Sequence, residues 1–205
     1  MDAAVGFRVE KENFSGLEAA LLMTKNSGKT RGVVNGLINM GGDLRGVASG
    51  VIGNDFDSGG GMMNSILASN CNEFSGMVSS GLFNFVCAMR EGGETDKEKK
   101  PARFYGMLAA GAGNGVEGEF RGFGIAGLVN SVRNLRGAMI AGLINVTTGK
   151  SYGTVNAFLM NGFEHDFSGV ANSLELNPCY SDYREVSECD CNGSFNALFT
   201  NAIPG

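Results

Sequence analysis

A repeat of 15 to 16 residues runs through nearly the whole chain of 205 residues. Two adjacent segments, residues 120–130 (FRGFGIAGLVN) and 135–145 (LRGAMIAGLIN), align without a gap. Each begins with Phe or Leu two residues before a glycine, and each ends in Gly-Leu-x-Asn. A unit this short cannot bury a core alone, so successive units must stack on one another.

The first glycine and the final asparagine of the unit recur at about the same interval along the chain. The first glycine recurs as Gly16, Gly32, Gly46, Gly61, Gly76, Gly106, Gly122, Gly137, Gly153 and Gly169. The final asparagine recurs as Asn39, Asn54, Asn70, Asn84, Asn114, Asn130, Asn145, Asn161 and Asn177. The two series predict one repeat domain over residues 1–205, interrupted by a charged loop at 90–102 and by a cysteine-containing loop at 178–194.

The abundance of glycine favours β-structure over helix. The chain contains 33 glycines, and a glycine in a helix interior costs roughly 1 kcal/mol relative to alanine. Glycine and asparagine both tolerate the backbone angles of tight corners. We therefore expect an all-β fold, a β-solenoid of about ten coils with the two loops inserted. The alternative is an antiparallel up-and-down meander or barrel, in which each unit is one strand and a turn.

A solenoid stacks equivalent residues into columns about 4.8 Å apart. Besides the glycine column and an asparagine ladder, in which side-chain amides bond along the stack, we expect two further columns. One contains small residues: Ala20, Ala110, Ala126, Ala141, Ala157 and Ser173. The other contains leucines: Leu22, Leu82, Leu128, Leu143 and Leu159. Glycines five apart, such as Gly122 and Gly127, suggest corners between three short faces, with the Phe/Leu, small and Leu columns pointing inward.

Residues directly after the first glycine form an apolar stripe that alternates away from the inward positions. They are Val33, Val47, Met62, Met77, Met107 and Phe123. An exposed stripe of this kind would mark an interface with another copy, a partner or lipid. The other interpretation is that both faces are buried in a sandwich or flattened barrel.

Arginines share the position before the first glycine, at Arg31, Arg45, Arg121 and Arg136. Asp43 and Glu119 each lie two residues before one of them, on the same face of an extended segment. This pattern indicates a salt-bridged surface, with contact to an anion or a glycan as the alternative.

No residue is singled out as catalytic, cofactor-binding or metal-binding, and we do not expect an enzyme. His165 is the single histidine and falls in a segment between two units that is predicted to be a turn. Residues 26–30 contain Gly-Lys-Thr but lack the first glycine of a phosphate loop. Asp55 and Asp57 lie near glycines, as in calcium-binding turns, but the pair does not recur in other units.

The cysteine pattern and the net charge limit which ligands and partners are expected. Cys179, Cys189 and Cys191 cluster without a second pair at zinc-ligand spacing, so free thiols are favoured over a local disulfide, and a metal comes last. The net charge is −5 and the basic residues are dispersed, which disfavours nucleic-acid binding.

The tandem unit resembles that of bacterial surface-repeat proteins built from G-x-x-x-x-G-L-x-N repeats. The similarity is closest over residues 120–145, with looser copies along nearly the whole chain. The resemblance implies association with the cell surface or envelope and no established chemistry. Residues 1–8 lack the charged and apolar regions of an export signal, so a cytoplasmic location is the other expectation.

The sequence therefore predicts a structural or interaction scaffold. It would form a homo-oligomer or filament, or bind a protein partner, through flat β faces or end coils. The alternative is a small membrane-associated β-barrel of the outer envelope. An enzyme such as a polysaccharide-cleaving solenoid is a third hypothesis, disfavoured because the acidic residues fall mostly in insertions and at unit junctions.

Overall fold

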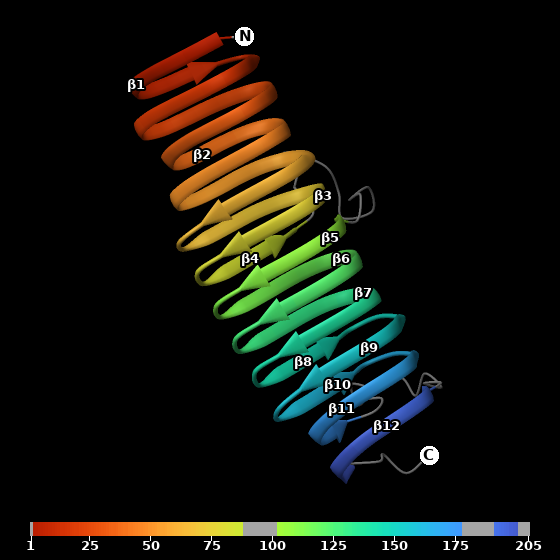
Figure 1. Ribbon diagram of the computed structural model, residues 1–205. Coiled ribbons are helices and arrows are strands. Elements are labelled where there is room, and N and C mark those ends of the chain that lie inside the picture. The colour runs from red at the N-terminus through yellow and green to blue at the C-terminus, as the bar shows by residue number, and fades with distance from the viewer. Residues whose placement is uncertain (1, 88–101, 178–190, 201–205) are drawn as a thin grey trace, which may run out of the picture.

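The protein is a parallel β-solenoid in the computed structural model, which describes residues 2–87, 102–177 and 191–200 (Figure 1). Every strand pairing among these residues is parallel, and the strands follow one another in a single stack. The predicted solenoid is confirmed. The antiparallel alternative, as a meander or a barrel, is wrong, because successive coils run in the same direction and stack by translation.

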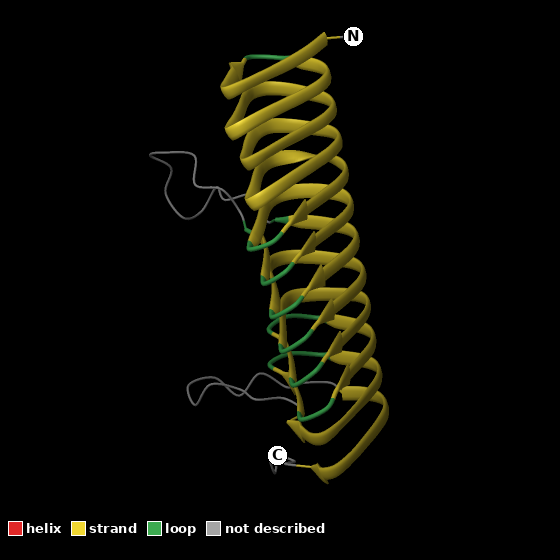
Figure 2. Ribbon diagram, turned by 60° about the vertical axis from the view of Figure 1, so that its left-hand side comes forward, coloured by secondary structure: helices red, strands yellow, loops and turns green. Residues whose placement is uncertain are grey.

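The strands trace both sides of each coil. In the described residues they are β1 (Asp2–Lys11), β2 (Phe14–Ser65), β3 (Ala68–Ser80), β4 (Phe83–Val86), β5 (Arg103–Ala110), β6 (Gly113–Ala126), β7 (Val129–Ala141), β8 (Ile144–Thr147), β9 (Ser151–Ala157), β10 (Met160–Phe163), β11 (Phe167–Asn177) and β12 (Cys191–Thr200). The long β2 winds continuously through several coils, whereas short loops interrupt the later coils (Figure 2).

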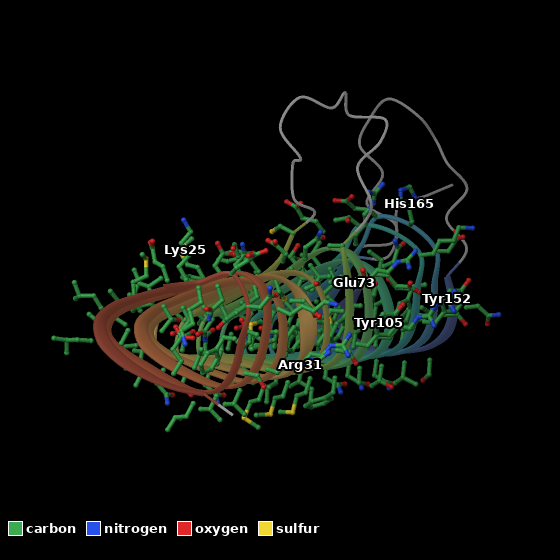
Figure 3. All side chains as sticks on the ribbon, turned by 90° about the horizontal axis from the view of Figure 1, so that it is seen from above. Lys25, Arg31, Glu73, Tyr105, Tyr152 and His165 are labelled. Atoms are coloured by element: carbon green, nitrogen blue, oxygen red, sulfur yellow. The ribbon has the colours of Figure 1, made fainter. Side chains whose placement is uncertain are left out.

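Each coil has two arms, and the coils superpose as a flattened ring when seen along the solenoid (Figure 3). In β6 the asparagine arm spans residues 114–116 and the glycine arm spans residues 120–126. The polar edge, residues 117–119 in this coil, joins them on one side, and the turn edge, residues 127–129, leads to the next coil. The expectation of three faces is wrong, because Gly122 lies within the glycine arm and only Gly127 is at a corner.

The glycine column is in register over the length of the solenoid, as predicted. Gly106, Gly122 and Gly137 pair directly with one another, and the column extends to Gly193. Its members have φ between +123° and +149°, a region that side chains disfavour. From Gly32 onward, a Cβ at any of them would lie 1.8–2.1 Å from the carbonyl oxygen of the preceding glycine in the column. Only glycine lets the coils approach this closely.

The two insertions are only partly within the described residues. Residues 90–101 and 178–190, which include Cys179 and Cys189, lie outside them. Residues 191–194, expected at the end of the second insertion, instead belong to β12 and pair with residues 167–170 of β11. On either side of the first insertion, β3 and β5 pair in register through Gly76 and Gly106.

The asparagine ladder is confirmed at seven positions, all of them buried: Asn39, Asn54, Asn84, Asn114, Asn130, Asn145 and Asn161. The side-chain amide of Asn114 donates to Oδ1 of Asn130 at 2.8 Å, and Asn145 donates to Asn161 at 3.0 Å. Each amide from Asn114 to Asn161 also donates to a carbonyl oxygen of the glycine arm, at 2.7–2.8 Å. The ladder thus holds successive coils to one another and the two arms together.

The ladder assignment is wrong for Asn70 and Asn177. Ser69 occupies the ladder position and pairs with Asn54 and Asn84, while Asn70 lies outside and donates to Asp55 Oδ1 at 3.0 Å. In the last turn, Leu176 pairs with Asn161, and Asn177 is one residue beyond the column. The coil length decides both cases, because a step of 15 residues reaches Ser69 and Leu176.

Inward-facing side chains of both arms form one continuous core. The Phe/Leu column at the start of the glycine arm is buried. The rings of Phe74 and Phe104 stack with centroids 6.2 Å apart, and those of Phe104 and Phe120 are tilted with centroids 5.8 Å apart. The small-residue column is also in register, as Ala110 pairs with Ala126 and Ala126 with Ala141. Small side chains there leave room for the asparagine ladder beside them.

Candidate interaction surfaces

The leucine column does not point inward, and this is the largest departure from the sequence-based expectation. The leucines lie at the turn edge, where the chain reverses direction and consecutive side chains splay outward. We define the apolar ridge as the exposed large apolar residues of this edge, which are 37–68% exposed: Leu21, Leu22, Val51, Ile52, Ile66, Leu67, Leu82, Phe83, Leu128, Val129, Leu143, Phe158 and Leu159.

The apolar ridge is free of charge along almost the whole molecule. The corner segments 21–23, 37–38, 51–53, 66–68, 81–83, 111–113, 127–129, 142–144 and 158–160 contain no Asp, Glu, Lys, Arg or His. Consecutive apolar pairs such as Ile66 and Leu67 were the available sequence signal, because neighbours in an extended chain cannot both face inward. Sequence reasoning missed this surface.

The polar edge, on the opposite side of the coil, has the reverse character. It carries charged residues in successive coils, and Lys150 Nζ lies 3.2 Å from Asp166 Oδ2. His165 is exposed at this edge, in a bend that follows β10, and projects outward (Figure 3). The two edges make the solenoid amphipathic across its width.

The arginine column lies on the outer face of the glycine arm, and three of its four members, Arg45, Arg121 and Arg136, form the predicted salt bridges. Arg45 Nε lies 3.3 Å from Asp43 Oδ2. Glu119 Oε1 lies 2.7 Å from Arg121 Nη2 and 3.7 Å from Arg136 Nε. The hydrogen bond that the Arg121 guanidinium donates to Glu119 raises the pKa of Arg121.

Two tyrosines extend the same column, which sequence reasoning missed. Tyr105 pairs with Arg121, and Arg136 pairs with Tyr152. The guanidinium of Arg121 lies 5.5 Å from the ring centroid of Tyr105, and that of Arg136 lies 6.0 Å from the ring of Tyr152, within cation–π range. The shared signal was the position directly before a column glycine.

The apolar stripe is on the outer face of the glycine arm, as its alternation predicts. Met62, Met77, Met107 and Phe123 follow one another in register. Met107 and Phe123 are each 37% exposed, and the other members are half-buried. The interpretation that both faces are buried in a sandwich or barrel is therefore wrong.

The two ligand-like motifs of the sequence both lie within β2. Residues 26–30 lie within β2, not between a strand and a helix, and the buried Asn26 amide donates to Glu18 Oε2 at 2.9 Å. Asp55 accepts the amide of Asn70, and burial, together with the charge of Asp55, raises the pKa of Asp57. In the described part of the chain, no three His, Cys, Asp or Glu side chains are grouped as metal ligands would be.

Neither Cys71 nor Cys87, two cysteines in the described residues, is joined in a disulfide. Cys71 is buried in the core, and this burial, followed by the nearby Cys87 and Asp55, raises its pKa to about 12. Cys191 belongs to β12.

Comparisons with known proteins do not test the family that the repeat resembles. No protein-family model, curated protein or solved structure matches the chain. Within the described ranges, no helix has the length and hydropathy needed to cross a membrane.

Proposed function

We propose that the protein is a structural scaffold that assembles with a second copy of itself through the apolar ridge. The β-solenoid is a repeat scaffold, an architecture that fits a structural role. One observation carries the step to assembly, namely the uncharged line of thirteen exposed apolar side chains along the turn edge.

The apolar ridge exposes apolar surface to water along the solenoid. Burying apolar surface is favourable by roughly 25 cal/mol per Å², and soluble monomers rarely expose a contiguous apolar patch larger than a few hundred Å². Coils spaced by about 4.8 Å extend the ridge from Leu21 near one end to Phe158 and Leu159 near the other, and it is interrupted at the corners of residues 37–38 and 111–113, which contribute no member. A long exposed ridge of this kind favours a partner that covers it.

A second copy is the occupant that the geometry fits best. Its own ridge has the same spacing between coils, so two ridges can pack side by side about a two-fold axis. A surface of anionic lipid would favour a basic flank, whereas the chain carries a net charge of −5. Association with a cell envelope remains an expectation from the repeat resemblance alone.

The end coils offer a different contact. In the described residues β1 pairs only with β2 and β12 only with β11, so each end strand has one edge without a strand partner. Unpaired strand edges can pair with another chain. Contact through these edges would join copies end to end into a filament, whereas contact through the ridge closes a dimer.

Light scattering coupled to size-exclusion chromatography tests the proposal. We expect the wild-type protein to have at least the mass of a dimer at about 50 μM, a concentration suited to a micromolar dissociation constant. The ridge variant Leu128→Lys/Leu143→Lys should be monomeric. The control Ser15→Lys/Ser131→Lys adds the same charge at exposed positions on the arms and should behave like the wild type.

A wild-type protein that remains monomeric, or a ridge variant that keeps the wild-type mass, would refute assembly through the ridge. A mass that grows continuously with concentration, and is unaffected by the ridge substitutions, would place the contact at the end coils. Circular dichroism of each variant checks that the β-structure is intact.

A further inference from the structure

A notch interrupts the outer face of the glycine arm between Arg45 and Tyr105. At the position directly before the column glycine, most coils carry a long side chain, but two successive coils carry Gly60 and Ser75. The missing side chains leave a depression of about 560 Å³. Its polar lining comes from Asp43, Arg45, Ser58, Glu73, Ser75 and Tyr105, of which Glu73 and Tyr105 are labelled in Figure 3.

At the level of the notch, one coil also lacks the inward-facing Phe or Leu side chain. Gly59 occupies the position that is Phe or Leu in most other coils, with φ of +145°, and a Cβ there would lie 2.0 Å from the carbonyl oxygen of Leu44. No side chain can therefore stand at this position.

The interior at this level is nevertheless filled. Phe56 enters from the asparagine arm and is fully buried, and Gly41 leaves the space that its ring needs. A Cβ at Gly41 would lie 2.7 Å from that ring. The hollow is thus a feature of the outer surface and not a packing defect of the core.

The chemistry of the lining indicates the ligand. One wall provides the aromatic ring of Tyr105 and the other the guanidinium of Arg45, which Asp43 already contacts at 3.3 Å. Asp43, Ser58 and Glu73 occupy successive coils, so the Cα atoms of the two acidic residues are roughly 10 Å apart, two strand spacings. Two carboxylates and one guanidinium disfavour a phosphate or another anion.

The lining combines carboxylates, serine hydroxyls and a guanidinium with one aromatic ring. This combination suits a ligand with many hydroxyl groups and no charge. The volume lies within the range of small-molecule sites, about 300–1,000 Å³. We propose that this notch binds a short neutral oligosaccharide, with one sugar ring against Tyr105 and its hydroxyls bonded to Asp43, Glu73 and Ser75. The site is on the arm face, apart from the apolar ridge, so it does not depend on self-assembly.

Saturation-transfer and amide chemical-shift NMR on the whole chain test the proposal. The probes are three neutral trisaccharides, namely cellotriose, maltotriose and the N-acetylglucosamine trimer, with trigalacturonate as an anionic comparison, each up to about 10 mM to reach weak affinities. We expect at least one neutral trisaccharide to bind and trigalacturonate not to bind.

Three substitutions locate the binding. Ser75→Arg places in the notch the side chain found at the equivalent positions 121 and 136, so it fills the site with a residue that the repeat accepts and should abolish binding. Tyr105→Ala should weaken binding about tenfold. Tyr152→Ala, in the same column outside the notch, should leave binding unchanged.

Absence of binding by all three neutral probes would overturn the proposal, as would unchanged binding in a folded Ser75→Arg variant. Binding of trigalacturonate alone would also overturn it, in favour of an anion site. The light-scattering result on the ridge variant is independent of all these outcomes, so the two proposals can fail separately.

Discussion

The side-chain amide of Asn130 donates a 2.9 Å hydrogen bond to Oδ1 of Asn145 in the following coil. The same amide donates to the carbonyl oxygen of Ile140 at 2.8 Å, and Asn130 Oδ1 accepts from Asn114. One buried side chain therefore satisfies three neighbours, which makes the ladder a main determinant of coil register.

Removal of one ladder residue should destabilise the protein strongly. Asn130→Ala leaves the amide of Asn114, Oδ1 of Asn145 and the carbonyl of Ile140 each without one partner, and each buried orphan costs about 1–3 kcal/mol. We expect urea denaturation to show a loss of at least about 3 kcal/mol. Ser131→Ala, the exposed next residue, should change stability by less than about 0.5 kcal/mol. Equal effects of the two substitutions would contradict this role for the ladder.

Completion of the ladder should stabilise the protein. Ser69 stands at the ladder position, and Oδ1 of Asn84 is buried without a donor. Ser69→Asn would supply that donor and should raise the free energy of unfolding by about 1 kcal/mol. The hydroxyl of Ser65 lies 3.0 Å from that of Ser69 and would lose this partner. The substitution is therefore best combined with Ser65→Ala, which places at residue 65 the alanine found at the equivalent position of later coils. A loss of stability relative to Ser65→Ala alone would refute the prediction.

Glycine should be required in the column but not throughout the strands. A Cβ at Gly122 would lie 1.9 Å from the carbonyl oxygen of Gly106 at φ of +145°, whereas nothing lies within 4 Å of a Cβ at Gly162. Backbone strain of this kind costs about 1–3 kcal/mol, before the clash is counted. Thermal unfolding should show a large loss for Gly122→Ala and little change for Gly162→Ala. A well-tolerated Gly122→Ala would mean that the coils can move apart.

The buried Cys71 thiol should make stability fall in alkali. Its pKa is raised from 9.0 to about 12, so the folded protein keeps a proton that the unfolded chain loses. The stabilisation is therefore complete below pH 9 and declines between pH 9 and 12, by up to about 1.4 kcal/mol per pH unit.

Cys71→Val provides the matched comparison for this decline, since Val86 occupies the next position in the same column. The variant should show a shallower fall in urea-unfolding free energy above pH 9. Parallel curves for the two proteins would refute the assignment. In the native state below pH 9, Cys71 should also resist thiol reagents.

Much of the fold was predictable, because a solenoid copies its sequence period directly into space. The glycine column from Gly32 to Gly169 and seven ladder asparagines followed from spacing alone. The prediction failed at Asn70. A period of 15 or 16 residues leaves two neighbouring residues in each coil as candidates for the ladder position. Hydrogen bonding to the neighbouring coils, which pairs Ser69 with Asn54 and Asn84, decides which residue enters the column.

The sequence by itself determined the all-β class, the stacked repeat and the need for glycine at one position per coil. These properties depend on backbone sterics and on translation, and both are local. Only the tertiary structure decided that the coil has two arms, that Leu128 and its equivalents face solvent, and that a notch opens before Tyr105. Those outcomes depend on how the chain turns at each corner and on which side chains fill the shared interior, and a one-dimensional period does not contain that information.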